Sequence, residues 1–177
     1  MFTSDKERDF FYSWFFRAQL DENFDTDRQF FYFYALFDHL FKSYAKENEL
    51  KIKNMGLSFK SDEKEKNKMR FYLFSILYLN DAKVFADFNP FLMLRNCEKT
   101  QLIKRLSNLP DSVFNSHDLP DYAVLERLFM EIYRLRCELF HGEINLSNYN
   151  RDLYYEANMV LKDFFERLFR NNHSENK

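Results

Sequence analysis

The chain of 177 residues carries 26 Lys and Arg against 28 Asp and Glu, and its formal net charge of -2 favours neither a cationic nor a polyanionic partner. At this length we expect one domain, residues 1–177, and burial of roughly 70% of the unfolded chain's surface supports a core without disulfides or metals. Two glycines and three prolines are too few for a hairpin-rich sandwich or barrel, or for a glycine-rich phosphate loop. The composition therefore predicts an all-α fold.

Cysteine usage and hydropathy indicate a reducing, aqueous compartment. Cys97 and Cys137 lie far apart and form no CxxC pair, so we expect neither a disulfide framework nor a zinc knuckle. The first residues are charged where a signal peptide needs an apolar stretch. The uncharged run over 71–80 is much shorter than the ~20 residues that span a bilayer. We therefore expect a cytoplasmic protein with no membrane segment.

Helical periodicity predicts three helices in the first half of the chain. The first is expected over 5–20, where Ser4 and Glu7 form a capping box. The second is expected over about 25–47, and its aromatic side chains recur at spacings of three and four, which predicts a core face. A third helix over 62–79 is charged in its first half and apolar nearly all round in its second.

The second half of the chain is expected to hold four more helices and one long loop. Two short helices between 82 and 108 are broken near Asn89-Pro90, because proline disfavours helical geometry in the residue before it. The loop is expected over 107–120, which contains two prolines. The most regular helix follows over about 121–140, and an amphipathic helix over about 150–170 ends the fold. The core stripe of the 121–140 helix consists of Leu125, Leu128, Ile132, Leu135 and Leu139.

The candidate chemistry lies at the end of the 121–140 helix, in the segment Tyr133-Arg-Leu-Arg-Cys-Glu-Leu-Phe-His-Gly142. Arg136 and His141 are about 140° apart on an ideal helix, so they converge only if Gly142 releases the last turn or a second chain contributes. The helix face opposite the leucine stripe is also apolar, and a helix that is apolar on both faces is buried on both. That face consists of Phe129, Met130, Tyr133, Cys137 and Phe140. The pattern predicts a homodimer with a shared site.

The segment resembles the Arg-x4-His signature of HEPN domains, especially the Apea-like group, and the aromatic helix over 30–44 resembles their early helix. The match runs from about 26 to 170. The resemblance implies an up-and-down helical bundle with additional short helices that dimerises through the motif helix. It also implies a metal-independent endoribonuclease that leaves 2′,3′-cyclic phosphate and 5′-hydroxyl ends on RNA. The implied setting is a toxin–antitoxin pair or phage defence, with an antitoxin or another protein as partner.

Arg136 and His141 are the predicted catalytic pair, with no metal and no cofactor. An imidazole, with a reference pKa of ~6.5, takes the proton of a ribose 2′-hydroxyl near neutral pH, and a guanidinium holds the phosphate and stabilises its developing charge. Cys137, Arg134 and Glu138 are predicted to support them, and Arg134 is the second candidate for the motif arginine because it lies about 20° from His141. Basic side chains predicted to contact RNA phosphates are Arg127, Arg95, Lys99, Lys104 and Arg105.

Three other interpretations stay open. HEPN nucleases usually carry Asn, Asp or His after the arginine, whereas Cys137 is a weak hydrogen-bonding group, which favours an inactive HEPN domain that binds RNA or a protein. Arg136 and His141 can instead cap helix carbonyls or pair with Glu138 or Glu131 in a structural role. The chain can also be an unrelated helical bundle.

Cys137 and His141 have helical metal-ligand spacing, but they lack a clear third ligand, so we predict no metal site.

Overall fold

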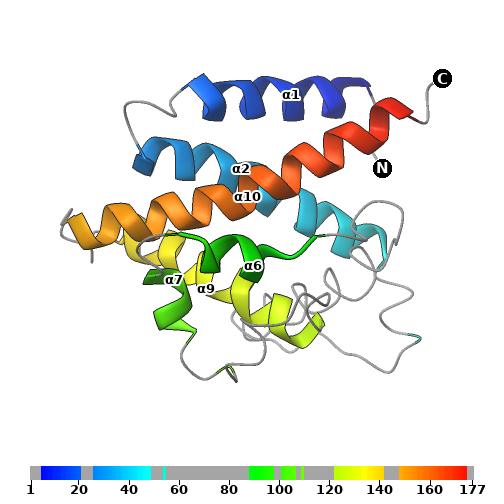
Figure 1. Ribbon diagram of the computed structural model, residues 1–177. Coiled ribbons are helices and arrows are strands. Elements are labelled where there is room, and N and C mark those ends of the chain that lie inside the picture. The colour runs from blue at the N-terminus through cyan, green and yellow to red at the C-terminus, as the bar shows by residue number, and fades with distance from the viewer. Residues whose placement is uncertain are drawn as a thin grey trace. The chain divides into compact units, whose positions relative to one another are not determined.

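The computed structural model describes residues 5–20, 26–48, 54, 88–97, 101–106, 109, 122–141 and 148–174. All regular elements within these ranges are helices, and none of the described helices is long and apolar enough to cross a bilayer. They are α1 (Asp5–Leu20), α2 (Thr26–Glu47), α6 (Pro90–Arg95), α7 (Gln101–Arg105), α9 (Tyr122–Phe140) and α10 (Asn148–Ser174) (Figure 1). The all-α prediction is confirmed for this part of the chain. The expected cap Ser4, the helix over 62–79 and nearly all of the loop over 107–120 lie outside the described residues.

The chain forms two compact units. The first consists of Met1–Asp38 and Leu135–Lys177, and the second consists of His39–Arg134. Helices α2 and α9 each contribute residues to both units. Arg136 and His141 therefore belong to the first unit, which is built from the two ends of the chain.

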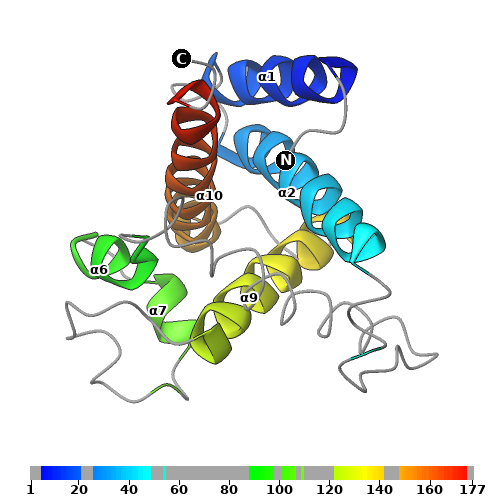
Figure 2. The same cartoon turned by 90° about the vertical axis from the view of Figure 1, so that its right-hand side faces the viewer.

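Aromatic packing holds the first unit together. In Figures 1 and 2, α1, the beginning of α2 and α10 lie side by side, and the side chains between them are buried. Three ring pairs, one for each pair of helices, have centroid distances of 6.5, 5.9 and 5.0 Å: Phe11 with Phe165, Phe15 with Phe33, and Phe30 with Tyr154. Each fully buried Phe contributes roughly 1.5–3 kcal/mol relative to an exposed one. The predicted core face of α2 is confirmed.

Two buried amide side chains connect the same three helices. Gln29 Nε2 donates to the carbonyl oxygen of Ala18 at 3.0 Å, near the end of α1 where helical carbonyls lack intrahelical donors. Asn158 Nδ2 donates to Gln29 Oε1 and to the carbonyl oxygen of Thr26, both at 2.9 Å. Buried polar groups are costly unless they are hydrogen-bonded, so these contacts favour one arrangement of α1, α2 and α10. No local spacing indicates this pair, because its members lie 129 residues apart in the chain.

In the second unit, α6 begins where the sequence predicts a break. Asn89 Oδ1 accepts a hydrogen bond from the backbone N–H of Leu92 at 3.1 Å, and Pro90 occupies the first helical position, where its missing N–H costs nothing. Both short helices follow this break, because α6 ends at the C-cap Asn96 and α7 begins at Gln101. Figure 2 shows α6 and α7 next to each other.

Helix α9 runs from Tyr122 to Phe140, within one residue of its predicted start, and most of its leucine stripe is buried. Leu139 is the exception, since it is only half-buried. On the opposite face, Phe129 is already fully buried within one chain, whereas Phe140 is 52% exposed. The expectation that a second chain covers this whole face is therefore wrong for its first half. On this aromatic face of α9, the large exposed side chain is Phe140 at the end of the helix.

Candidate functional site

The backbone at the end of α9 stays helical through His141. The N–H of His141 donates to the carbonyl oxygen of Cys137 at 3.0 Å, which is the hydrogen bond of an α-helical turn. Arg136 and His141 therefore point in directions about 140° apart around the helix axis. Gly142, which was expected to release this turn, lies outside the described residues. Within one chain, the geometry of α9 does not bring the two side chains together.

The guanidinium of Arg136 stacks on an exposed ring. Its Cζ atom lies 4.3 Å from the centroid of the Phe140 ring, a cation–π contact between residues four apart on α9. This contact directs the side chain toward the C-terminal end of the helix, to the level of the turn that carries His141. Phe140 is 52% exposed and Arg136 is half-buried, so this contact lies at the surface of the protein.

No carboxylate of the described ranges neutralises the motif pair. Neither Arg136 nor His141 forms an ion pair or a side-chain hydrogen bond with any described residue. The structural interpretation named two kinds of contact, capping of helix carbonyls and pairing with Glu131 or Glu138. Glu131 pairs with other arginines instead, and Glu138, which does interact elsewhere, does not pair with the motif residues.

The two arginines that neutralise Glu131 are Arg105 and Arg134. Glu131 is only 5% exposed, and a carboxylate at such a position must be paired. Its Oε1 accepts a hydrogen bond from Arg105 Nη1 at 3.1 Å, and its Oε2 accepts one from Arg134 Nη1 at 2.8 Å. Arg134, the second candidate for the motif arginine, thus points toward the N-terminal end of α9. Arg105, predicted to contact RNA, also has a structural partner.

Cys137 and Glu138 flank His141 on the helix surface. Cys137 lies about 100° from Arg136 and about 40° from His141, so its half-buried thiol is located between the two motif residues. Glu138 lies about 60° from His141 on the other side. Among the supporting residues, Cys137 is therefore the one placed between the catalytic candidates.

The remaining predicted RNA contacts are located in the second unit. Arg127 on α9, Arg95 in the last turn of α6 and Lys104 on α7 are exposed. Lys99 lies outside the described residues. These basic side chains belong to a different unit from Arg136 and His141, so they add no geometric constraint to the motif site.

A group of partly exposed rings begins beside Arg136, at Phe140, and was not predicted, because helical periodicity indicates a core role for aromatic side chains. We name this group the aromatic strip, and its members are Phe10, Trp14, Phe31, Tyr32 and Phe140. The ring of Phe140 lies 5.7 Å from Phe31, Phe31 lies 6.3 Å from Trp14, and Trp14 lies 5.6 Å from Phe10 and 5.5 Å from Tyr32. The contacts run without interruption from α9 over α2 to α1. The signal available in the sequence was the second aromatic pair at a spacing of four on α1, beside the buried Phe11 and Phe15.

The described residues contain no group of three or more His, Cys, Asp or Glu side chains that is placed to hold a metal ion.

The chain matches no known family model, no curated protein and no solved structure. The resemblance to HEPN domains therefore rests on the sequence motif.

Proposed function

We propose that this protein is a metal-independent endoribonuclease of the HEPN type that acts as a homodimer. One observation carries the proposal: α9 presents Arg136 and His141 without an ion-pair partner among the described residues, whereas Arg134 on the same helix is paired with buried Glu131. Arg105 and Arg134 neutralise buried Glu131, whereas Arg136 neutralises no carboxylate among the described residues. An accessible arginine and an accessible histidine are the groups that phosphodiester transfer requires.

In this mechanism, His141 removes the proton from a ribose 2′-hydroxyl, and the 2′-oxygen then attacks the adjacent phosphorus. The bond from phosphorus to the 5′-oxygen breaks, and the leaving oxygen takes a proton from water while His141 returns its proton to solvent, so the products are a 2′,3′-cyclic phosphate and a 5′-hydroxyl. Arg136 donates hydrogen bonds to the phosphate oxygens and stabilises the negative charge that builds up on them. Stacking on Phe140 orients the guanidinium before RNA binds.

The helical turn at His141 supports a dimeric site. Because Arg136 and His141 diverge on one chain, a two-fold axis beside the end of α9 is the simple way to place Arg136 of one chain opposite His141 of the other. Each of the two sites then contains an arginine from one protomer and a histidine from its partner.

The test is to incubate protein stripped of metal with mixed RNA in the presence of a chelator. We expect fragments with 2′,3′-cyclic phosphate ends, which resist alkaline phosphatase until acid opens the ring. His141→Ala protein purified in the same way is the control for contaminating nucleases. Fragments with 3′-hydroxyl ends, or equal cleavage by the control, would contradict the proposal.

Cys137 favours a second candidate function, a catalytically inactive HEPN domain that binds RNA or a protein partner. Its thiol occupies the position between Arg136 and His141, where a stronger hydrogen-bonding group would orient the pair. RNA binding without cleavage by the wild-type protein would select this alternative. For the nuclease, the resemblance to HEPN domains suggests a cytoplasmic toxin or phage-defence role with an antitoxin or another protein as partner.

A further inference from the structure

The aromatic strip lies outside the core of the first unit, although its helices also build that core. On α1, Phe11 and Phe15 are buried, but Phe10 is 36% exposed and Trp14 is half-buried. On α2, Phe31 is 38% exposed, whereas the neighbouring Phe30 and Phe33 are fully buried. A soluble protein keeps large rings accessible in one contiguous group mainly where they contact a partner. The strip is therefore a candidate interaction surface.

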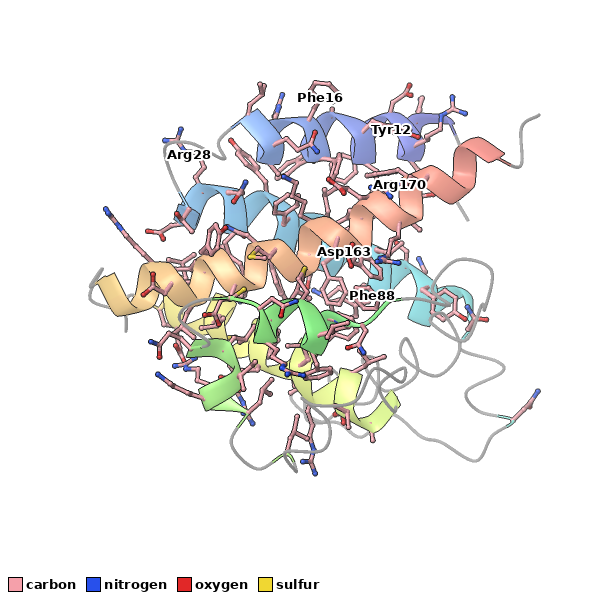
Figure 3. The ribbon with its side chains drawn as sticks, viewed as in Figure 1. Tyr12, Phe16, Arg28, Phe88, Asp163 and Arg170 are labelled. Atoms are coloured by element: carbon pink, nitrogen blue, oxygen red, sulfur yellow. The ribbon has the colours of Figure 1, made fainter. Side chains whose placement is uncertain are left out.

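Arginine side chains border the strip, and they indicate the chemistry of the partner. Arg136 stacks on Phe140 at one end. Arg28 is exposed at the start of α2 (Figure 3), on the same helix face as Phe31 and Tyr32, and the exposed Arg17 follows Trp14 by one turn of α1. Two half-buried acidic residues lie on the same helix faces, Glu7 on α1 and Asp27 on α2, and both of them, like Arg28, also interact within the chain.

Ring faces with a cationic border suit an unpaired nucleic acid strand. Bases stack on aromatic side chains and guanidinium planes, while the phosphates contact the arginines. The strip's rings contact one another in tilted or edge-on geometry, with interplanar angles of 35–78°, so they do not cover one another's faces in parallel stacks. A duplex keeps its bases stacked inside and offers no base faces to such a surface.

We propose that the aromatic strip is a binding platform for single-stranded RNA, which crosses α1 and α2 and reaches Arg136 and His141 past Phe140. The choice of RNA as the ligand rests on the proposed function. The strip adds the substrate class, because a site reached over stacking rings selects an unpaired strand over a duplex.

Trp14 allows a direct measurement, since it is the single tryptophan of the chain and lies in the middle of the strip. The His141→Ala protein, which leaves RNA intact, is titrated with a short mixed-sequence oligoribonucleotide and with the duplex of the same sequence. We expect the single strand to quench the Trp14 fluorescence through base stacking, and the duplex to quench it much less. Absence of quenching by the single strand, or equal binding of the duplex, would overturn the inference.

Two substitutions in the same background separate the strip from general apolar binding. Phe31→Ala removes a strip ring and is expected to weaken single-strand binding by roughly five- to a hundredfold, the usual range for loss of one stacked base. Phe16→Ala is the matched control, because Phe16 is 63% exposed on α1, faces away from α10 (Figure 3) and is not part of the strip. Equal effects of the two substitutions would overturn the inference.

Phe10→Ala repeats the test at the far end of the strip, so the result does not depend on the folding of one variant. Sedimentation of Phe31→Ala gives an independent check. Conversion of a wild-type dimer to a monomer would show that a second copy of the chain covers the strip, which overturns the RNA platform.

The outcomes also separate this inference from the proposed function. Wild-type cleavage of RNA with an unchanged KM in Phe31→Ala would overturn the platform alone. Single-strand quenching of Trp14 without any cleavage by the wild-type protein would support the platform and overturn the nuclease.

Discussion

Arg134 and Arg136 lie two residues apart on α9, yet their side chains make different contacts. Arg134 donates to the buried carboxylate of Glu131, which Arg105 of α7 also contacts. Arg136 stacks on the exposed ring of Phe140 and has no carboxylate partner among the described residues. Residue type and helix position do not distinguish them, because both satisfy a loose arginine–histidine spacing. The burial of one glutamate on one side of the helix makes the difference.

The role of a charged side chain on such a helix depends on whether it offsets the burial of an opposite charge. Removing a carboxylate from water costs several kcal/mol, which its partners must offset, so the arginines around it stabilise the fold. A guanidinium on an exposed ring offsets no such cost, and its contact contributes only about 0.5–1 kcal/mol. Substitution of Arg134 should therefore affect mainly the stability of the fold, whereas substitution of Arg136 should affect mainly RNA cleavage.

The largest expected effect is on catalysis. His141→Ala and Arg136→Ala should each reduce RNA cleavage by roughly 10²- to 10⁴-fold, because one removes the general base and the other removes the phosphate ligand. Urea unfolding should place both variants within about 1 kcal/mol of the wild-type stability. Arg134→Ala is the matched control and should retain cleavage. If Arg134→Ala loses activity as completely as Arg136→Ala, the assignment of the motif arginine is reversed.

The next prediction concerns whether Arg136 of one protomer acts together with His141 of its partner. Mixing inactive Arg136→Ala and inactive His141→Ala proteins, with subunit exchange, should restore about a quarter of the wild-type activity, because half of the dimers are mixed and each has one intact site. Cleavage is measured before and after exchange, and sedimentation should give twice 21.8 kDa. A site formed within one chain predicts no recovery, and a monomer at micromolar concentration removes the shared site.

A smaller effect is expected on stability when the buried carboxylate is neutralised. Glu131→Gln should lower the free energy of unfolding by about 1–3 kcal/mol, because one of the two arginines then faces an amide N–H instead of an acceptor. Urea denaturation measures the change. Glu166→Gln disrupts the exposed pair with Arg170 and should change stability by less than about 0.5 kcal/mol. Similar losses in the two variants would mean that burial does not distinguish the pairs.

The smallest effect concerns Cys137. Cys137→Asn places a stronger hydrogen-bonding group between Arg136 and His141, which contributes about 0.5–1.5 kcal/mol and should raise the cleavage rate roughly two- to tenfold. Initial rates on one RNA substrate at saturating concentration give the comparison. A lower rate with an intact dimer would show instead that the thiol has a role of its own.

The sequence predicted those parts of the fold that depend on local patterns. The limits of α1 and the start of α6 follow from side-chain periodicity and from the restricted backbone of Pro90, and both agree with the structure. Periodicity failed at the ends of α10, which extends from Asn148 to Ser174, because polar terminal turns carry no apolar stripe.

For the candidate site, the sequence identified Arg136 and His141 but not the contacts that separate them from their neighbours. The partner of Glu131 on α7, Arg105, lies 26 residues earlier in the chain, a distance at which no local spacing indicates a contact. The aromatic strip was missed for a similar reason. Periodicity shows that Phe10 and Phe31 can share a helix face with other rings, but only the packing of three helices decides which face is covered.

The buried amide pair has a consequence for how the protein is made. Gln29 and Asn158 are 129 residues apart, and the bond from Asn158 to Thr26 spans 132 residues. During synthesis at about 5–20 residues per second, the apolar faces of α1 and α2 remain uncovered for several seconds until α10 emerges from the ribosome. The first unit, which includes Arg136 and His141, therefore assembles only after α10 has been synthesised. Nascent chains without α10 expose Phe11 and Phe30 to aggregation or to a chaperone, and they do not yet present the assembled helices around the site.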